Sequence, residues 1–154
     1  MTTYFSYGAN MDPVHMAEQC PGAVRLGPAV LPDHAFGIAA GHYGTVRPAA
    51  GRSVHGVLWR LTPRDEAALD QFEGVAKGFY RKDDARVMST DGAAVTAMIY
   101  RPVDDTPGVP SRRYLERIIE VATQLRFPET YLDQLKACRV AGRDPSSPAD
   151  SRIQ

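Results

Sequence analysis

The chain has 154 residues, of which 44% are hydrophobic and 23% are charged, and 18 Lys and Arg balance 18 Asp and Glu. This length and composition predict one globular domain with a single core, and a formal net charge of zero gives no reason to expect a nucleic acid partner. No apolar run is long enough to span a membrane, and the N-terminus lacks a signal-peptide pattern, so we expect a cytoplasmic protein without a membrane segment.

The first predicted strand covers residues 4–7 and runs into a turn and a short helix. Three aromatic residues and one serine give this segment a strand-like composition, while Gly8 and Asn10 favour a turn. The Asp12-Pro13 pair suits the start of a helix over residues 13–19. A tight strand-to-helix turn leaves backbone N–H groups that could bind an anion or a developing oxyanion. A purely structural turn is the alternative.

The next fifty residues are predicted to contain strands of unequal clarity. Residues 24–40 alternate loosely between apolar and polar and indicate one bent strand or two short ones. Residues 41–52 are rich in Gly, Ala and Pro, which predicts an irregular loop with a short strand at 45–47. Residues 53–61 form the clearest strand pattern, with Val57, Trp59 and Leu61 on one face.

A capped helix comes next and is followed by a hairpin. Thr62 is the predicted N-cap, two acidic residues occupy the first turn, and the Glu73-Gly74 pair ends the helix. Residues 79–88 and 94–101 indicate two strands, and the intervening Thr90-Asp91-Gly92 is typical of a hairpin turn.

The C-terminal third is predicted to be helical. Residues 102–110 contain three prolines and two aspartates, which indicates a surface loop. Ser111 caps a helix whose apolar residues keep a helical period as far as Leu125, and residues 128–138 form a second, shorter helix.

The complete pattern predicts an α+β domain. Strands and helices interleave irregularly, so we expect a small mixed β-sheet, curled into a barrel-like shape and flanked by helices. This domain should cover residues 1–140, and residues 141–154, rich in Ser and Pro, should form a flexible tail.

Glu73 is the candidate for acid–base chemistry. It closes a helix, where the negative end of the helix dipole opposes a carboxylate, and its neighbours Phe72, Val75 and Phe79 are apolar. Such surroundings would raise the pKa of the carboxyl group, which suits a general acid or base near neutral pH. The alternative is a helix end that points its carboxylate into water.

Other residue types offer weaker candidates. The four histidines share no metal-ligand spacing, so we expect no metal site. Cys20 has no neighbouring base that would make its thiol a nucleophile, and the two cysteines form neither a disulfide framework nor a zinc pattern. No serine elbow, phosphate loop or dinucleotide fingerprint is present.

Four segments, taken in order, resemble the gamma-glutamylcyclotransferase family. Residues 4–11, Tyr-Phe-Ser-Tyr-Gly-Ala-Asn-Met, resemble its Tyr-Gly-Ser-Asn-Leu signature, and residues 54–59 resemble its Gly-Val-Val-Trp-like strand. Residues 69–80 resemble its Leu-Asp-x-x-Glu-Gly-Val…Gly-x-Tyr segment, where the glutamate is catalytic. Tyr100 at a strand end, and a loop-to-helix entry at 110–114, match the family's C-terminal third. The resemblance runs from about residue 4 to 138.

The resemblance implies an enzyme that converts a γ-glutamyl amino acid, or a related γ-glutamyl amide, to 5-oxoproline and a free amine. Glu73 would be the general acid/base. It implies a small-molecule γ-glutamyl substrate, no metal or organic cofactor, and leaves a homodimer open. The substrate would be bound by the N-terminal turn and by tyrosines, namely Tyr7, Gly8, Ala9, Asn10, Met11, Tyr80, Tyr100 and Tyr114.

The match departs from the family at two positions of the signature. Ala9 replaces the usual serine and removes its hydroxyl, and Met11 replaces a leucine of similar volume. The segment after Glu73 lacks the pattern of the glutathione-specific branch, which favours the general branch. Two alternatives remain: a cyclotransferase for a γ-glutamyl amine or a biosynthetic intermediate, decided by His42, Tyr43 and the 102–110 loop, or a non-catalytic γ-glutamyl-binding module.

Overall fold

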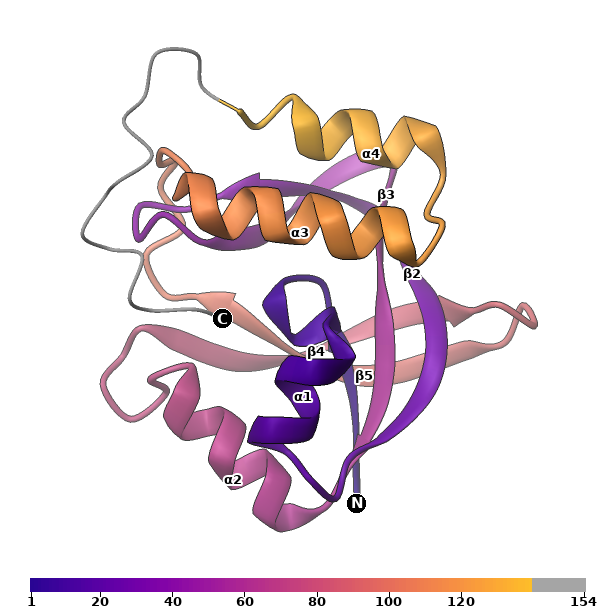
Figure 1. Cartoon of the computed structure of the whole chain (residues 1–154), viewed down its shortest axis with the longest axis vertical. Coiled ribbons are helices and arrows are strands. Elements are labelled where there is room, and N and C mark those ends of the chain that lie inside the picture. The colour runs from indigo at the N-terminus through magenta and orange to yellow at the C-terminus, as the bar shows by residue number, and fades with distance from the viewer. Residues whose placement is uncertain (140–154) are drawn as a thin grey trace.

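The computed structural model describes residues 1–139 and shows a closed five-stranded barrel with helices packed around it (Figure 1). The strands are β1 (Thr2–Ser6), β2 (Val24–Ile38), β3 (Gly44–Leu61), β4 (Tyr80–Ser89) and β5 (Ala94–Pro102). Their order around the barrel is β1-β3-β2-β4-β5. Neighbouring strands are antiparallel except β1 and β5, which pair in parallel and close the barrel. The predicted mixed, barrel-like sheet is confirmed; the tail predicted at 141–154 lies outside the described residues.

Four α-helices and one short 3₁₀ helix surround the barrel in the described part of the chain. They are η1 (Ala9–Met11), α1 (Pro13–Gln19), α2 (Pro63–Phe72), α3 (Arg112–Gln124) and α4 (Glu129–Lys136). Helices α3 and α4 lie side by side across one end of the barrel, and α2 lies toward the opposite end in this view (Figure 1). Within residues 1–139, no helix combines the length and the apolar character that a membrane crossing requires.

The helix starts predicted from the sequence are confirmed by their caps. Asp12 accepts a hydrogen bond from the Val14 N–H at 3.0 Å. Thr62 and Asp65 form a reciprocal capping box, with both bonds at 3.1 Å. The Ser111 hydroxyl accepts from the backbone of the first turn of α3. Each such cap stabilises its helix by about 1 kcal/mol, so these three residues fix where the helices leave the barrel.

One predicted loop is largely wrong. Residues 41–52 were expected to be an irregular loop with a short strand at 45–47; that strand is present, but it belongs to β3, which begins at Gly44 and runs for 18 residues. It pairs with β2 along its length, so the partner strand supplies hydrogen bonds that outweigh the weak strand preference of Gly, Ala and Pro. The alternative of one bent strand for 24–40 is confirmed by β2, whose register with β3 shifts between Arg25 and Gly27 and between Pro32 and His34. The predicted hairpin strands agree with β4 and β5 to within one residue.

The end of β1 is locked onto β3 by a buried serine. Ser6 Oγ donates to the Val57 carbonyl at 3.1 Å and accepts from Trp59 Nε1 at 3.0 Å. Gly56 makes this close approach possible, because a Cβ there would lie 2.2 Å from the Ser6 carbonyl oxygen. The turn that follows β1 therefore starts from a fixed point on the barrel.

Candidate active site

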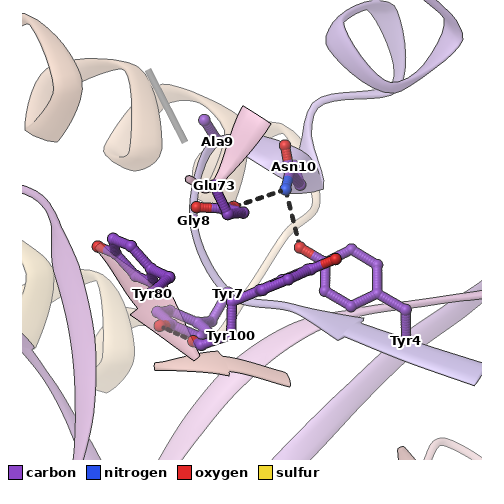
Figure 2. A pocket seen from close by; sticks show the side chains of 8 residues that line it. All are labelled: Tyr4, Tyr7, Gly8, Ala9, Asn10, Glu73, Tyr80 and Tyr100. Atoms are coloured by element: carbon purple, nitrogen blue, oxygen red, sulfur yellow. Dashed lines mark hydrogen bonds between the residues drawn. The ribbon is translucent and has the colours of Figure 1, made fainter. Parts of the chain in front are cut away.

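A narrow pocket lies beside the turn that follows β1 (Figure 2). Its lining comes from β1 and the turn, from the end of α2, and from β4 and β5, segments that are far apart in sequence. The space amounts to about 230 Å³, including the part open to solvent. The lining residues are Tyr4, Tyr7, Gly8, Ala9, Asn10, Glu73, Tyr80 and Tyr100.

Glu73 is held in this pocket by the way α2 ends. It is the C-cap residue, and Gly74 follows with a φ of 69°, in the left-handed region that favours glycine. The Gly74 N–H donates to the Gln71 carbonyl at 3.1 Å and the Val75 N–H to the Asp70 carbonyl at 3.0 Å, which is a Schellman motif. The predicted helix end is thus confirmed.

The side chain of Glu73 is buried, with 5% of its surface exposed. The alternative of a carboxylate pointing into water is therefore wrong. A buried carboxylate is costly unless it is hydrogen-bonded, and Asn10 meets part of that need: its Nδ2 donates to Glu73 Oε1 at 3.3 Å and to Tyr4 Oη at 2.8 Å. The raised pKa expected for Glu73 stays a prediction.

The hydroxyl groups of three pocket tyrosines are donated to the protein itself. Tyr7 donates to the Tyr100 carbonyl at 2.5 Å, and Tyr80 donates to the Gly44 carbonyl at 3.1 Å. Tyr100 donates to Asp70 Oδ1 at 2.7 Å. Their rings therefore form walls of fixed orientation around Glu73, as Figure 2 shows for Tyr7, Tyr80 and Tyr100.

The phenols of Tyr4, Tyr7 and Tyr100 are unsuited to act as bases near neutral pH. Burial raises the pKa of Tyr4, Tyr7 and Tyr100, and the negative charge of Glu73 raises each pKa further. Among the described residues that line the pocket, Glu73 is therefore the group suited to exchanging protons.

Two predicted site residues lie behind the pocket rather than on its surface. Tyr114 accepts a hydrogen bond from the Gly44 N–H at 3.1 Å, and its hydroxyl would lie 2.8 Å from a Cβ at Gly8. Gly8 has a φ of −123°, so it is needed for space and not for a left-handed backbone. Met11 is fully buried in the core beside the turn. Both residues support the turn from behind.

Sequence reasoning did not single out two residues that the structure brings to the site. Tyr4 lines the pocket and bonds Asn10, and Asp70 anchors Tyr100 from outside. A signal existed for each: Tyr4 opens the aromatic run that ends at Tyr7, and Asp70 lies three positions before Glu73 on the same helix. The other predicted residues, from the turn, α2, β4 and β5, do meet in one pocket.

The described residues contain no group of three or more His, Cys, Asp or Glu side chains that could hold a metal ion. The pocket itself offers the carboxylate of Glu73, the side-chain amide of Asn10 and the backbone N–H groups of the turn. This arrangement can bind a small polar molecule and move protons at one buried point.

The fold has close counterparts among solved structures. A structure titled gamma-glutamyl cyclotransferase matches 97% of this chain and 96% of its own, with a TM-score of 0.83 and 23% sequence identity. The protein YkqA from Bacillus subtilis matches 88% of this chain and 53% of its own, with a TM-score of 0.74 and 21% identity. At these identities the likeness defines the class of fold: the gamma-glutamylcyclotransferase-like barrel.

Sequence comparison defines the family. The profile of the AIG2-like family matches residues 53–135. The gamma-glutamylcyclotransferases of Mus musculus and Homo sapiens are 31% and 29% identical over 144 residues, which cover 87% of this chain and 77% of each relative. The chain belongs to the AIG2-like, gamma-glutamylcyclotransferase family, and the resemblance carried by the four sequence segments is confirmed.

Proposed function

We propose that this protein is a gamma-glutamylcyclotransferase that converts a γ-glutamyl amino acid or related γ-glutamyl amide to 5-oxoproline and a free amine. The observation that carries the proposal is the buried Glu73 carboxylate, hydrogen-bonded by Asn10 and enclosed by tyrosine rings. The relatives named gamma-glutamylcyclotransferase support the same reaction class.

The reaction is intramolecular. The α-nitrogen of the glutamyl group attacks its own γ-carbonyl carbon, a five-membered lactam forms, and the bond between that carbon and the leaving nitrogen breaks. Ring closure already gives the two reacting atoms a high effective concentration. The protein's main tasks are therefore to fold the substrate into the reactive shape, exclude water and transfer protons.

Glu73 begins the reaction ionised and takes a proton from the α-ammonium, which frees the nitrogen lone pair. It then gives that proton to the leaving nitrogen as the tetrahedral intermediate collapses. After the attack the ring nitrogen carries one proton too many, and Glu73 transfers this proton to the leaving nitrogen as well. The amine therefore departs as an ammonium ion, and Glu73 is ionised again. The hydrogen bond from Asn10 Nδ2 to Glu73 Oε1 favours the ionised starting state.

The N-terminal turn supplies the candidates for binding negative charge. Gly8, Ala9 and Asn10 line the pocket, so their backbone N–H groups are suited to the substrate carboxylate or to the tetrahedral oxyanion. Ala9 brings no hydroxyl to this turn, so the backbone carries the role alone. Tyr7, with its hydroxyl already donated to the protein, contributes an apolar ring that keeps water from the reacting centre.

The proposal is tested by measuring 5-oxoproline released from γ-glutamyl dipeptides, γ-glutamyl amines and glutathione. Glu73→Gln keeps the size of the side chain but removes the proton acceptor, so we expect the rate to fall by about 10²- to 10⁴-fold. Glu120→Gln is the matched control, since Glu120 is exposed on α3, and it should keep full activity.

Full activity in Glu73→Gln would overturn the assigned role of this carboxylate. No release from any compound, with folded protein confirmed by circular dichroism, would overturn the cyclotransferase reaction. Calorimetric titration with 5-oxoproline would then distinguish a γ-glutamyl-binding module, which binds the compound, from an unrelated function.

A further inference from the structure

A second, more open groove begins where the Glu73 pocket ends. The two share Tyr80, and the ring of Phe79 packs against Gly74, the residue after Glu73: a Cβ at Gly74 would lie 2.4 Å from that ring. The groove holds about 690 Å³ of space, including the part open to solvent. Its lining residues are Ala39, Ala40, Gly41, Tyr43, Gly78, Phe79, Tyr80, Pro102, Val103 and Asp104.

The walls of this groove are tied together by backbone hydrogen bonds. The Val103 N–H donates to the Phe79 carbonyl at 3.0 Å, which joins the two apolar edges. The Gly108 N–H donates to the Ile38 carbonyl at 3.0 Å, which fastens the loop after β5 to the end of β2. The groove is therefore a built part of the fold rather than a gap between loose loops.

The groove combines apolar surface with a single negative charge. Phe79 and Val103 are 44% and 55% exposed, high values for such side chains, and both face this space. Asp104 Oδ1 accepts hydrogen bonds from the Thr106 hydroxyl and N–H, which lower the pKa of Asp104 and keep it ionised. Among the described residues that line the groove there is no Lys, Arg or His.

One cation beside the loop after β5, Arg47, is already engaged. Arg47 donates to the carbonyls of Ile38 and Asp105, each at 3.1 Å, and forms an ion pair with the Asp105 carboxylate at 3.3 Å. A carboxylate entering the groove would meet Asp104 with no cationic side chain among the described lining residues, whereas an apolar or cationic group would be accepted.

We propose that this groove binds the leaving amine of the γ-glutamyl substrate and selects amines that carry no carboxylate. The inference rests on the proposed function: once the glutamyl group fills the Glu73 pocket, the substituent on the leaving nitrogen extends past Tyr80 into the groove. The substrate class is then a γ-glutamyl amide of an apolar or cationic amine, in preference to a γ-glutamyl amino acid.

A pair of nearly isosteric substrates tests this charge selection. γ-Glutamyl-alanine and γ-glutamyl-alaninamide differ only in whether the leaving group carries a carboxylate, and 5-oxoproline release gives kcat/KM for each. We expect the amide to be favoured by at least about five-fold, the discrimination that a like charge within several ångströms gives.

Variants of Asp104 then locate the selection. Asp104→Asn keeps a side-chain oxygen for Thr106 and should reduce the preference to about two-fold, and Asp104→Lys should reverse it. Asp133→Lys makes the same change of charge on an exposed residue of α4 and should leave the preference as in the wild type.

Release of 5-oxoproline with equal or better use of γ-glutamyl-alanine by the wild type would overturn the groove assignment and leave the reaction intact. An unchanged preference in both Asp104 variants would also overturn it. No release from any γ-glutamyl compound would overturn the proposed function, and this inference with it.

Discussion

The Glu73 pocket and the neighbouring groove share Tyr80 but differ in size and in the exposure of their other lining side chains. In the pocket, side chains are buried, and hydroxyl and amide groups are hydrogen-bonded to one another. In the groove, Phe79, Val103 and Asp104 are exposed. About 230 Å³ of space lies in the first and about 690 Å³ in the second. The polar groups are therefore held in fixed positions in the pocket, where charge would develop during the reaction. The groove, where the substituent of the substrate would vary, is more exposed.

On the proposed reaction, this contrast separates two tasks. The pocket would bind the glutamyl group, which every substrate shares, and the groove would bind the part that differs between substrates. Changes in the pocket should therefore lower activity for all substrates alike, and changes in the groove should alter the ranking of substrates. Substitutions in and around the pocket test whether activity falls equally for all substrates.

After Glu73 itself, the largest effect is expected at Asn10. Asn10→Leu keeps the volume but removes the hydrogen bonds to Glu73 and Tyr4, so the carboxylate is no longer held in one orientation. We expect kcat/KM to fall by about 10²-fold for every γ-glutamyl substrate, measured by 5-oxoproline release. Tyr4→Phe removes only the Tyr4 hydroxyl that accepts from Asn10, so kcat/KM should fall by less than in Asn10→Leu. Unequal losses across substrates would break the division between pocket and groove.

A smaller effect is expected at Asp70. Asp70→Ala leaves the buried Tyr100 hydroxyl without its acceptor and removes one partner of Lys82. The unsatisfied hydroxyl should cost about 1–3 kcal/mol, seen as a Tm lowered by about 2–8 °C, with activity reduced for all substrates.

Glu66→Ala is the matched control for Asp70→Ala. Glu66 pairs with the same Lys82 at 2.8 Å but does not bond Tyr100. It should leave kcat/KM within about two-fold of the wild type, because a partly exposed ion pair contributes at most about 1 kcal/mol. Equal losses of activity in the two variants would show that the ion pair, and not the orientation of Tyr100, is what matters.

The smallest effect concerns the protonation of the pocket tyrosines. The pKa of Tyr7 in the folded protein is raised by burial, whereas the unfolded side chain ionises near pH 10. Its contribution to stability is therefore fully present below about pH 10 and is lost as the pH rises above it. The difference in free energy of unfolding between the wild type and Tyr7→Phe should therefore become smaller as the pH rises from about 8 to about 11, measured by urea unfolding. A constant difference would contradict this.

Local signals in the sequence were sufficient to predict the helix boundaries. Asp12, Thr62 and Ser111 cap the helices they were expected to cap, because a cap depends on residues within one turn. Gly74 marked the end of α2 for the same reason. The start of β3 at Gly44 was missed because its strand character comes from β2, a partner defined only by the folded chain.

The candidate site was predicted only in part, because some of its features depend on local sequence and others on contacts between distant segments. Glu73 and the turn at Gly8 stood out through local chemistry and through the family resemblance, and the structure brings them together. The direction of each tyrosine hydroxyl was not predictable, since Tyr7 and Tyr80 donate to carbonyls 93 and 36 residues away in the chain. The groove was anticipated only at Tyr43 and the 102–110 loop.

The parallel pairing of β1 with β5 has a consequence for folding. Tyr4 lies opposite Met98, so the barrel closes only when the two ends of a segment of almost a hundred residues meet. Contacts of such long range form late and slow the folding of small domains. Tyr4, Glu73 and Tyr100 meet only through that closure, so recovery of activity during refolding would report the last step of barrel assembly, after the secondary structure has formed.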